Sequence, residues 1–203
     1  RLGAVTIVNA GDVAVENTFA AESLLQQAGS GTTTIDGTTM LSGPAGIEVN
    51  SHAIVVNGAI DVQSAVAGGS LRLVAGDDLV VNSQLLSGTG PVDLLAGDDI
   101  TFTAAGSIAS IAGMVTVRAD ADGDASGAGG ALMMADGSRV DAGTGDVLLS
   151  ADEDITLSSV VTAGGTPTAI RITSTSGGIV DGGDSDVDLV ASSPGAVVTI
   201  SAA

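Results

Sequence analysis

A short motif recurs along the chain and constrains its fold more than any other feature. Each copy has an apolar residue, a variable residue and a second apolar residue, followed by a short acidic turn. The clearest copies are Leu71-Arg72-Leu73, Val92-Asp93-Leu94, Val115-Thr116-Val117 and Val147-Leu148-Leu149, with looser ones at Ile47, Ile170 and Val197. Their starts are 24, 21, 23, 32, 23 and 27 residues apart. An irregular period near 25 residues is typical of a solenoid with loop insertions.

Two further apolar runs follow the motif within each period, for example Ile54-Val55-Val56 and then Ile60-Asp61-Val62. These runs are short, rich in β-branched residues and separated by Gly, Asp, Asn or Ser, which indicates β-strands. Three short strands per coil of about 20–25 residues predict an all-β fold, a parallel β-helix whose coils stack at ~4.8 Å. The rival all-β fold, a sandwich, has longer strands and aromatic residues in its core, whereas this chain has two Phe, no Trp and no Tyr.

The repeats predict β-helix coils over residues 47–203, as part of one continuous solenoid. The 32-residue period points to a loop insertion at 120–130. Residues 1–46 are expected to form irregular N-terminal coils. Within them, 18–28 fit either a short helix, with Thr18 as its N-cap and Gly29 after its end, or another coil with Phe19 inside. The chain starts at Arg1 without a signal peptide and stops in mid-pattern, so we expect it to be a fragment of a longer protein.

Charge excludes some classes of partner. The chain has 24 acidic residues against five Arg, a net charge of −19. Nucleic-acid binding requires a basic surface, which five scattered Arg do not provide.

No run of ~18 apolar residues is present, so no membrane-spanning helix is expected. The absence of Cys removes disulfides and thiolate metal sites.

The repeat region resembles filamentous-haemagglutinin-like exoproteins, the large adhesins of two-partner secretion systems. The blocks that carry the resemblance are Ala75-Gly76-Asp77-Asp78-Leu79, Ala96-Gly97-Asp98-Asp99-Ile100-Thr101 and Gly145-Asp146-Val147-Leu148-Leu149 through Asp154-Ile155-Thr156-Leu157. This resemblance implies a right-handed β-helix, secretion without disulfides, an extracellular or cell-surface (outer-membrane associated) location and an adhesive or scaffolding role. It transfers no functional residue, because the stalk repeats carry no catalytic motif.

Two features raise the possibility of catalysis. His52 is the only histidine, so a Ser-His-Asp site would have to include it; we interpret it as an exposed turn residue. The pairs Asp77-Asp78 and Asp98-Asp99 are similar to the Asp pair of β-helical pectin-degrading hydrolases. However, the Gly-His-Gly and Arg-x-Lys elements of those enzymes are missing here. Because the pair recurs with the repeat, returning as Asp152 and Asp154, we interpret it as a turn whose carboxylates accept backbone N–H groups.

The alternating carboxylates Asp120, Asp122 and Asp124 are the strongest candidate metal ligands, since hard oxygen ligands suit Ca²⁺. The alternative is a solvated acidic loop, because the match to an EF-hand is poor. We expect this loop to lie near the stacked Asp pairs, where Ca²⁺, salt or turn N–H groups would relieve repulsion.

Strand alternation predicts two outward columns of side chains. The first-strand column brings Arg72 between two acidic residues; its members are Glu48, Arg72, Asp93, Thr116, Leu148 and Arg171. The second-strand column has no charge; its members are Val55, Val80, Thr101, Met133, Thr156 and Val180. Such a strip is uncommon on the open surface of a monomer. Either a loop or residues 18–29 cover it, or it contacts a neighbouring copy or domain of the parent protein.

The expected function is therefore a non-enzymatic adhesin stalk or scaffold, with a host or surface receptor or a polysaccharide as a further partner. A self-assembling extracellular filament or sheath subunit is the first alternative. A carbohydrate-active β-helix enzyme is the second.

Overall fold

The chain folds into a β-solenoid. A computed structural model describes residues 1–64, 68–122, 129–183 and 187–203. In these ranges every regular secondary-structure element is a β-strand, and the strands form three parallel sheets. Neighbours in each sheet are three strands apart in sequence, so the chain enters every sheet once per coil. The predicted all-β parallel β-helix with three strands per coil is confirmed.

Each sheet runs the length of the solenoid. The first sheet comprises β1 (Ala4–Ile7), β4 (Ser23–Gln26), β7 (Ile47–Ser51), β10 (Leu71–Ala75), β13 (Val92–Ala96), β16 (Val115–Arg118), β19 (Val147–Ala151), β22 (Ile170–Ser174) and β25 (Val198–Ser201). The second comprises β2 (Val13–Val15), β5 (Thr32–Ile35), β8 (Ala53–Val56), β11 (Leu79–Val81), β14 (Ile100–Phe102), β17 (Leu132–Met134), β20 (Ile155–Leu157) and β23 (Ile179–Asp181). The third comprises β3 (Phe19–Ala21), β6 (Thr39–Leu41), β9 (Ile60–Asp61), β12 (Gln84–Ser87), β15 (Ser107–Ser110), β18 (Arg139–Asp141), β21 (Ser159–Thr162) and β24 (Leu189–Ala191).

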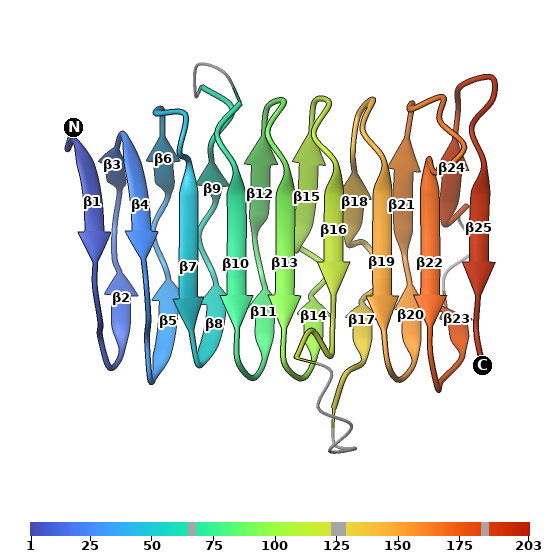
Figure 1. Cartoon of the computed structure of the whole chain (residues 1–203), viewed down its shortest axis with the longest axis horizontal. Helices are drawn as coiled ribbons and strands as arrows, with labels where there is room; N and C mark the ends of the chain where they lie inside the picture. The colour runs from blue at the N-terminus through green and yellow to red at the C-terminus, as the bar shows by residue number, and fades with distance from the viewer. Residues whose placement is uncertain (65–67, 123–128, 184–186) are drawn as a thin grey trace.

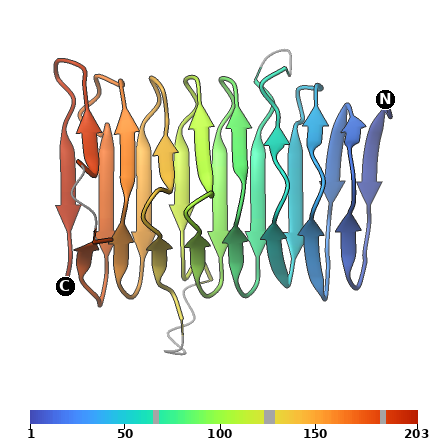
Figure 2. The same cartoon turned by 180° about the vertical axis from the view of Figure 1, so that it is seen from behind.

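The winding is right-handed. In Figure 1 the strands of the first sheet descend in front while those of the other two sheets rise behind them, and the chain advances from the N-terminus on the left to the C-terminus on the right. Figure 2 shows the back of the solenoid, where the second sheet forms the lower half and the third sheet the upper half.

The core is a set of apolar columns that run through the coils. In β10, Leu71 and Leu73 point inward and are fully buried, whereas Arg72 between them is half-exposed. Leu71 pairs with Ile47 on one side and Val92 on the other, both fully buried. Each coil thus buries its inward side chains against the equivalent side chains of the next coil, and this burial is the main contribution to folding.

The N-terminal residues form regular coils, and no helix is present at 18–28. Phe19–Ala21 is β3 and Ser23–Gln26 is β4, each paired in register with the next coil. The prediction of irregular coils at 1–46 is wrong, because polar residues occupy interior positions there and interrupt the apolar pattern of the sequence. Gln26 and Thr33 are about 1% exposed: the Gln26 amide donates to the Thr33 hydroxyl (2.9 Å), and that hydroxyl donates to Ser51 Oγ (3.0 Å). These bonds allow polar side chains to occupy core positions.

At the C-terminal end the strand register differs from the predicted one. Val198, not Val197, pairs with Ile170, so the last coil is one residue longer than predicted. In the third sheet, β24 begins at Leu189, which pairs with Val160, while Val187 lies outside the strand and is 72% exposed. The 32-residue step runs from Val115 to Val147, and its extra residues lie between β16 and β17.

Among the described residues there is no helix long and apolar enough to span a membrane.

Candidate functional site

The turns that join the first sheet to the second form an acidic corner. We use this name for six residues in the equivalent turn of three coils: Asp77, Asp78, Asp98, Asp99, Asp152 and Asp154. Glycine permits the close stacking of these turns, because a Cβ added to Gly97 would clash with the carbonyl oxygen of Gly76. The solenoid therefore places at neighbouring positions carboxylates that are more than 20 residues apart in sequence.

The second carboxylate of each pair caps the backbone of the next coil. Asp78 Oδ1 accepts the N–H of Asp99 at 3.3 Å. Asp99 Oδ1 accepts the N–H groups of Gly130 and Ala131, both at 2.9 Å. For the second carboxylate of each pair, these bonds confirm the interpretation of a turn whose carboxylates accept backbone N–H groups.

The same bond recurs in a later coil, where Asp154 Oδ1 accepts the N–H of Gly178 at 2.7 Å. In that turn Asp152 accepts hydroxyl donors from Thr175 and from Ser176. Because these hydroxyls stabilise the charged form, they lower the pKa of Asp152 below its ordinary value.

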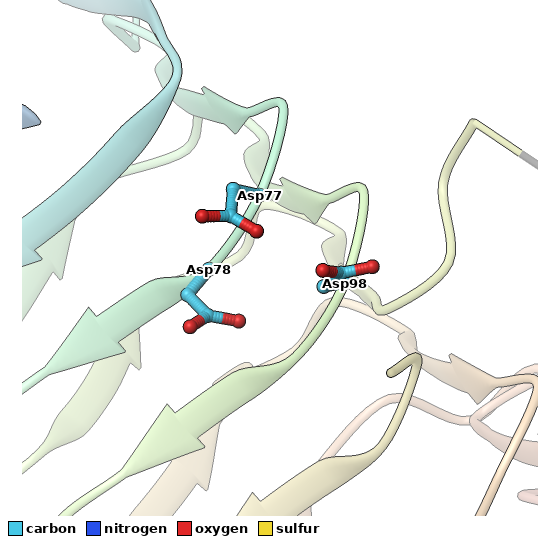
Figure 3. Close-up of side chains that lie close together, drawn as sticks. All are labelled: Asp77, Asp78 and Asp98. Carbon is cyan, nitrogen blue, oxygen red and sulfur yellow. The ribbon is translucent and has the colours of Figure 1, made fainter. Parts of the chain in front are cut away.

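Three carboxylates of the corner converge. Oxygen atoms of Asp77, Asp78 and Asp98 lie within 4.8 Å of one another (Figure 3). A hydrogen bond between the Asp77 and Asp98 side chains raises the pKa of Asp98, and partial burial and the charges of Asp77, Asp78 and Asp99 raise it further. Asp98 thus binds a proton more tightly than an ordinary aspartate, because the proton relieves the repulsion between the carboxylates.

This triad can accommodate a hard cation in place of the shared proton. Ca²⁺ takes six to eight oxygen ligands at ~2.3–2.6 Å, with carboxylates and water as common donors. Asp77, Asp78 and Asp98 would supply the protein ligands, and water would complete the shell. The sequence signal for the triad is the Gly-Asp-Asp motif at two consecutive repeats, where Ca²⁺, salt or turn N–H groups are expected to relieve the repulsion, although the predicted ligands are those of the loop.

The predicted loop ligands lie beside this corner. The N–H of Asp120 donates to the carbonyl of Asp98 at 3.3 Å, and Asp120 adopts a left-handed backbone with φ 54°. The Asp122 carboxylate lies beside Gly97 in the neighbouring turn. Asp124 falls outside the described residues. The oxygens that converge within 4.8 Å come from Asp77, Asp78 and Asp98 and do not include those of Asp120 or Asp122.

His52 contacts the same corner. Its Nε2 atom lies 3.6 Å from Oδ2 of Asp77, and its side chain is 58% exposed, as expected for a turn histidine. The hydroxyl of the adjacent Ser51 donates to the carbonyl of Gly31 at 2.8 Å. Ser51 is therefore engaged in joining two coils.

The outer face of the first sheet carries the predicted charge ladder. Arg72 pairs in register with Glu48 and with Asp93. Its Nε lies 3.7 Å from Glu48 Oε1, and its Nη1 lies 3.8 Å from Asp93 Oδ2. The column then continues through Thr116, Leu148 and Arg171, so the predicted alignment is confirmed.

The outer face of the second sheet carries the uncharged column in the predicted register. We call the six residues the second-sheet strip: Val55, Val80, Thr101, Met133, Thr156 and Val180. Met133 is 39% exposed and Val180 48%, and the other four are half-buried. Residues 18–29 do not cover the strip, because they form part of the coils themselves.

Comparison with known proteins finds no similar family, protein or structure. No protein-family model matches the chain. No curated protein matches it, and no solved structure does so either.

Proposed function

We propose that this chain is a non-enzymatic structural segment of a secreted or cell-surface protein, an adhesin stalk or scaffold of the filamentous-haemagglutinin-like kind. The observation that carries the proposal is that polar side chains recur with the coils and bond one coil to the next. Asp78, Asp99 and Asp154 illustrate this, since each carboxylate accepts an N–H from the following coil. A catalytic group is needed once, whereas a structural one is needed in every coil.

The second-sheet strip is the surface through which the scaffold contacts a neighbouring copy. Six stacked coils at ~4.8 Å give a strip ~25–30 Å long, with no charged side chain among its six members. Burial of such a strip against an equivalent strip removes apolar surface from water without desolvating any charge. Lateral association of this kind would also serve the alternative role of a filament or sheath subunit.

Sedimentation velocity over a concentration series tests this proposal. We expect the chain to associate as its concentration rises, and Val80→Asp with Met133→Asp to weaken association while the far-UV circular dichroism is unchanged. Thr116→Asp is the matched control, because it adds an outward charge to the first sheet. A chain that is monomeric at every concentration, or equal weakening by the control, would contradict lateral association.

Enzymatic activity is tested separately. The purified chain is incubated with acidic polysaccharides, and new reducing ends are measured. We expect none to form. Release that is abolished by Asp98→Asn would contradict the structural role and favour the carbohydrate-active alternative.

Calcium binding is a second candidate function, supported by the convergence of the Asp77, Asp78 and Asp98 oxygens within 4.8 Å. A cation that binds only the folded chain raises its stability by RT ln(1 + [L]/Kd). Thermal melts in EDTA and in millimolar Ca²⁺, at matched ionic strength, measure this effect. We expect a higher midpoint in Ca²⁺, and identical midpoints would leave the turn hydrogen bonds as the only role of these carboxylates.

A further inference from the structure

Two arginines on the outer face of the first sheet lack the carboxylate partners that other arginines have. Arg72 pairs with Glu48 and Asp93, and Arg139 pairs with Asp141 at 2.9 Å. In the described part of the chain, neither Arg118 nor Arg171 forms an ion pair. Arg118 Nη2 donates to the backbone carbonyl of Asp120 at 3.3 Å.

The register explains this difference. Arg171 in β22 lies between Leu148 and Thr199, and Arg118 in β16 lies between Leu95 and Ser150. None of these four neighbours is acidic. The strands that carry Arg118 and Arg171 flank β19, so both guanidinium groups face the same stretch of the sheet.

A groove of about 340 Å³ lies between them. Leu148 and the hydroxyl-bearing residues Ser150, Thr173 and Thr175 line it together with Arg118 and Arg171. Asp120 and Asp152 also line the groove. Thr175 and Ser176 already donate to the Asp152 carboxylate. We call this site the arginine groove.

We propose that the arginine groove binds a polysaccharide that carries carboxylates, that is, a uronate-containing glycan. A guanidinium group offers a fork of N–H donors that matches a carboxylate. β16 and β22 are two strand spacings, or about 10 Å, apart. The groove therefore suits a ligand with carboxylates on more than one sugar unit, whose hydroxyls meet Ser150, Thr173 and Thr175.

An extended acidic peptide fits this site less well. Peptides add to sheets at an unpaired edge strand, whereas β16, β19 and β22 are each paired on both sides. The ligand must therefore lie on the face of the sheet and use side chains alone. The proposal is independent of the second-sheet strip, which lies on a different sheet.

Isothermal titration calorimetry with hexagalacturonate tests the proposal. We expect binding that weakens with added salt, and no binding of the fully methyl-esterified hexamer, which keeps the ring and its hydroxyls but lacks the charges. In the double variant Arg118→Gln with Arg171→Gln we expect the affinity to fall by at least about tenfold, since hydrogen bonds to charged groups are lost.

Arg72→Gln with Arg139→Gln is the matched control, because it removes the same charge from arginines that are already paired. We expect its affinity to stay within about threefold of the original chain. Absence of binding to hexagalacturonate, equal binding of the methyl ester, or an equal loss in both double variants would overturn the proposal. Circular dichroism of every variant checks that the solenoid is intact.

Discussion

The outer faces of the first and second sheets avoid repulsion between stacked like charges in different ways. In a solenoid, equivalent residues stack at ~4.8 Å, so a charge repeated in every coil would repel its neighbours. The first sheet alternates its charges, and Arg72 lies between Glu48 and Asp93. The second sheet has no charge in its outward strip, where Val80 lies between Val55 and Thr101.

The acidic corner between these sheets shows a third arrangement. There the charges do recur, and backbone N–H groups and a hydrogen bond between Asp77 and Asp98 compensate for them. Each column of a solenoid thus has its own chemistry, which its register position determines. A column with neither charge nor compensating bonds can contact a second copy of the chain without desolvating a charge.

Stability should depend most strongly on which side of a second-sheet strand receives a charge. Val81 is fully buried between Val56 and Phe102, whereas its neighbour Val80 points outward. We expect Val81→Asp to destabilise the fold by several kcal/mol, because it buries an unpaired charge. We expect Val80→Asp to change stability by less than ~1 kcal/mol. Urea unfolding followed by circular dichroism measures both, and similar midpoints for the two variants would show that the strip is misassigned.

A smaller effect is expected in the charge ladder of the first sheet. Arg72→Gln removes two half-exposed ion pairs, each contributing roughly 0.2–1 kcal/mol. Because salt screens such pairs, we expect the loss at low ionic strength to shrink in 0.5 M salt. Arg171→Gln serves as the control, since Leu148 and Thr199 flank that residue. If both variants lose the same stability, the ladder contributes nothing through its charges.

The smallest effect concerns the pH dependence at the acidic corner. Because the pKa of Asp98 is raised in the folded chain, the folded state binds more protons than the unfolded state over the range just above the ordinary aspartate pKa. Stability therefore falls as the pH rises through this range. Asp98→Asn removes the repulsion, so at pH 7 we expect a gain within ~0.2–1 kcal/mol.

Urea unfolding at several pH values tests this expectation. The gain from Asp98→Asn should disappear below pH ~2.5, where Asp98 is protonated in both states. The variant should also lose any stabilisation by Ca²⁺. A constant gain at every pH would mean that the carboxylate charges are not its cause.

The sequence predicts the middle of the solenoid well because one apolar period governs all its coils. From Ile47 to Ile170 the predicted first-strand register is correct in every coil. At the N-terminus, Gln26 and Thr33 occupy inward positions, where a hydrogen bond between them satisfies their polar groups. The sequence does not reveal this bond, so the two residues do not look like core residues. At the C-terminus, Val197 and Val198 are identical in chemistry, so composition could not determine which of them pairs with Ile170.

The candidate site was predictable in place but not in detail. The repeated Asp pairs and the loop at 120–130 were expected to meet near one corner, and Asp120 does lie against Asp98. The choice of converging carboxylates depends on side-chain directions in stacked turns. Asp77, Asp78 and Asp98 converge because glycines allow close stacking there, and no spacing rule in the sequence specifies that geometry.

Oxidative cross-linking of single cysteines tests the central claim, that the uncharged outward face of the second sheet contacts a neighbouring copy. The chain contains no cysteine, so Val80→Cys introduces the only thiol, and Thr116→Cys places the same probe on the first sheet. After mild oxidation at equal concentration, we expect a disulfide-linked dimer from Val80→Cys and little from Thr116→Cys. Equal yields from the two variants, or no dimer from Val80→Cys, would contradict the account.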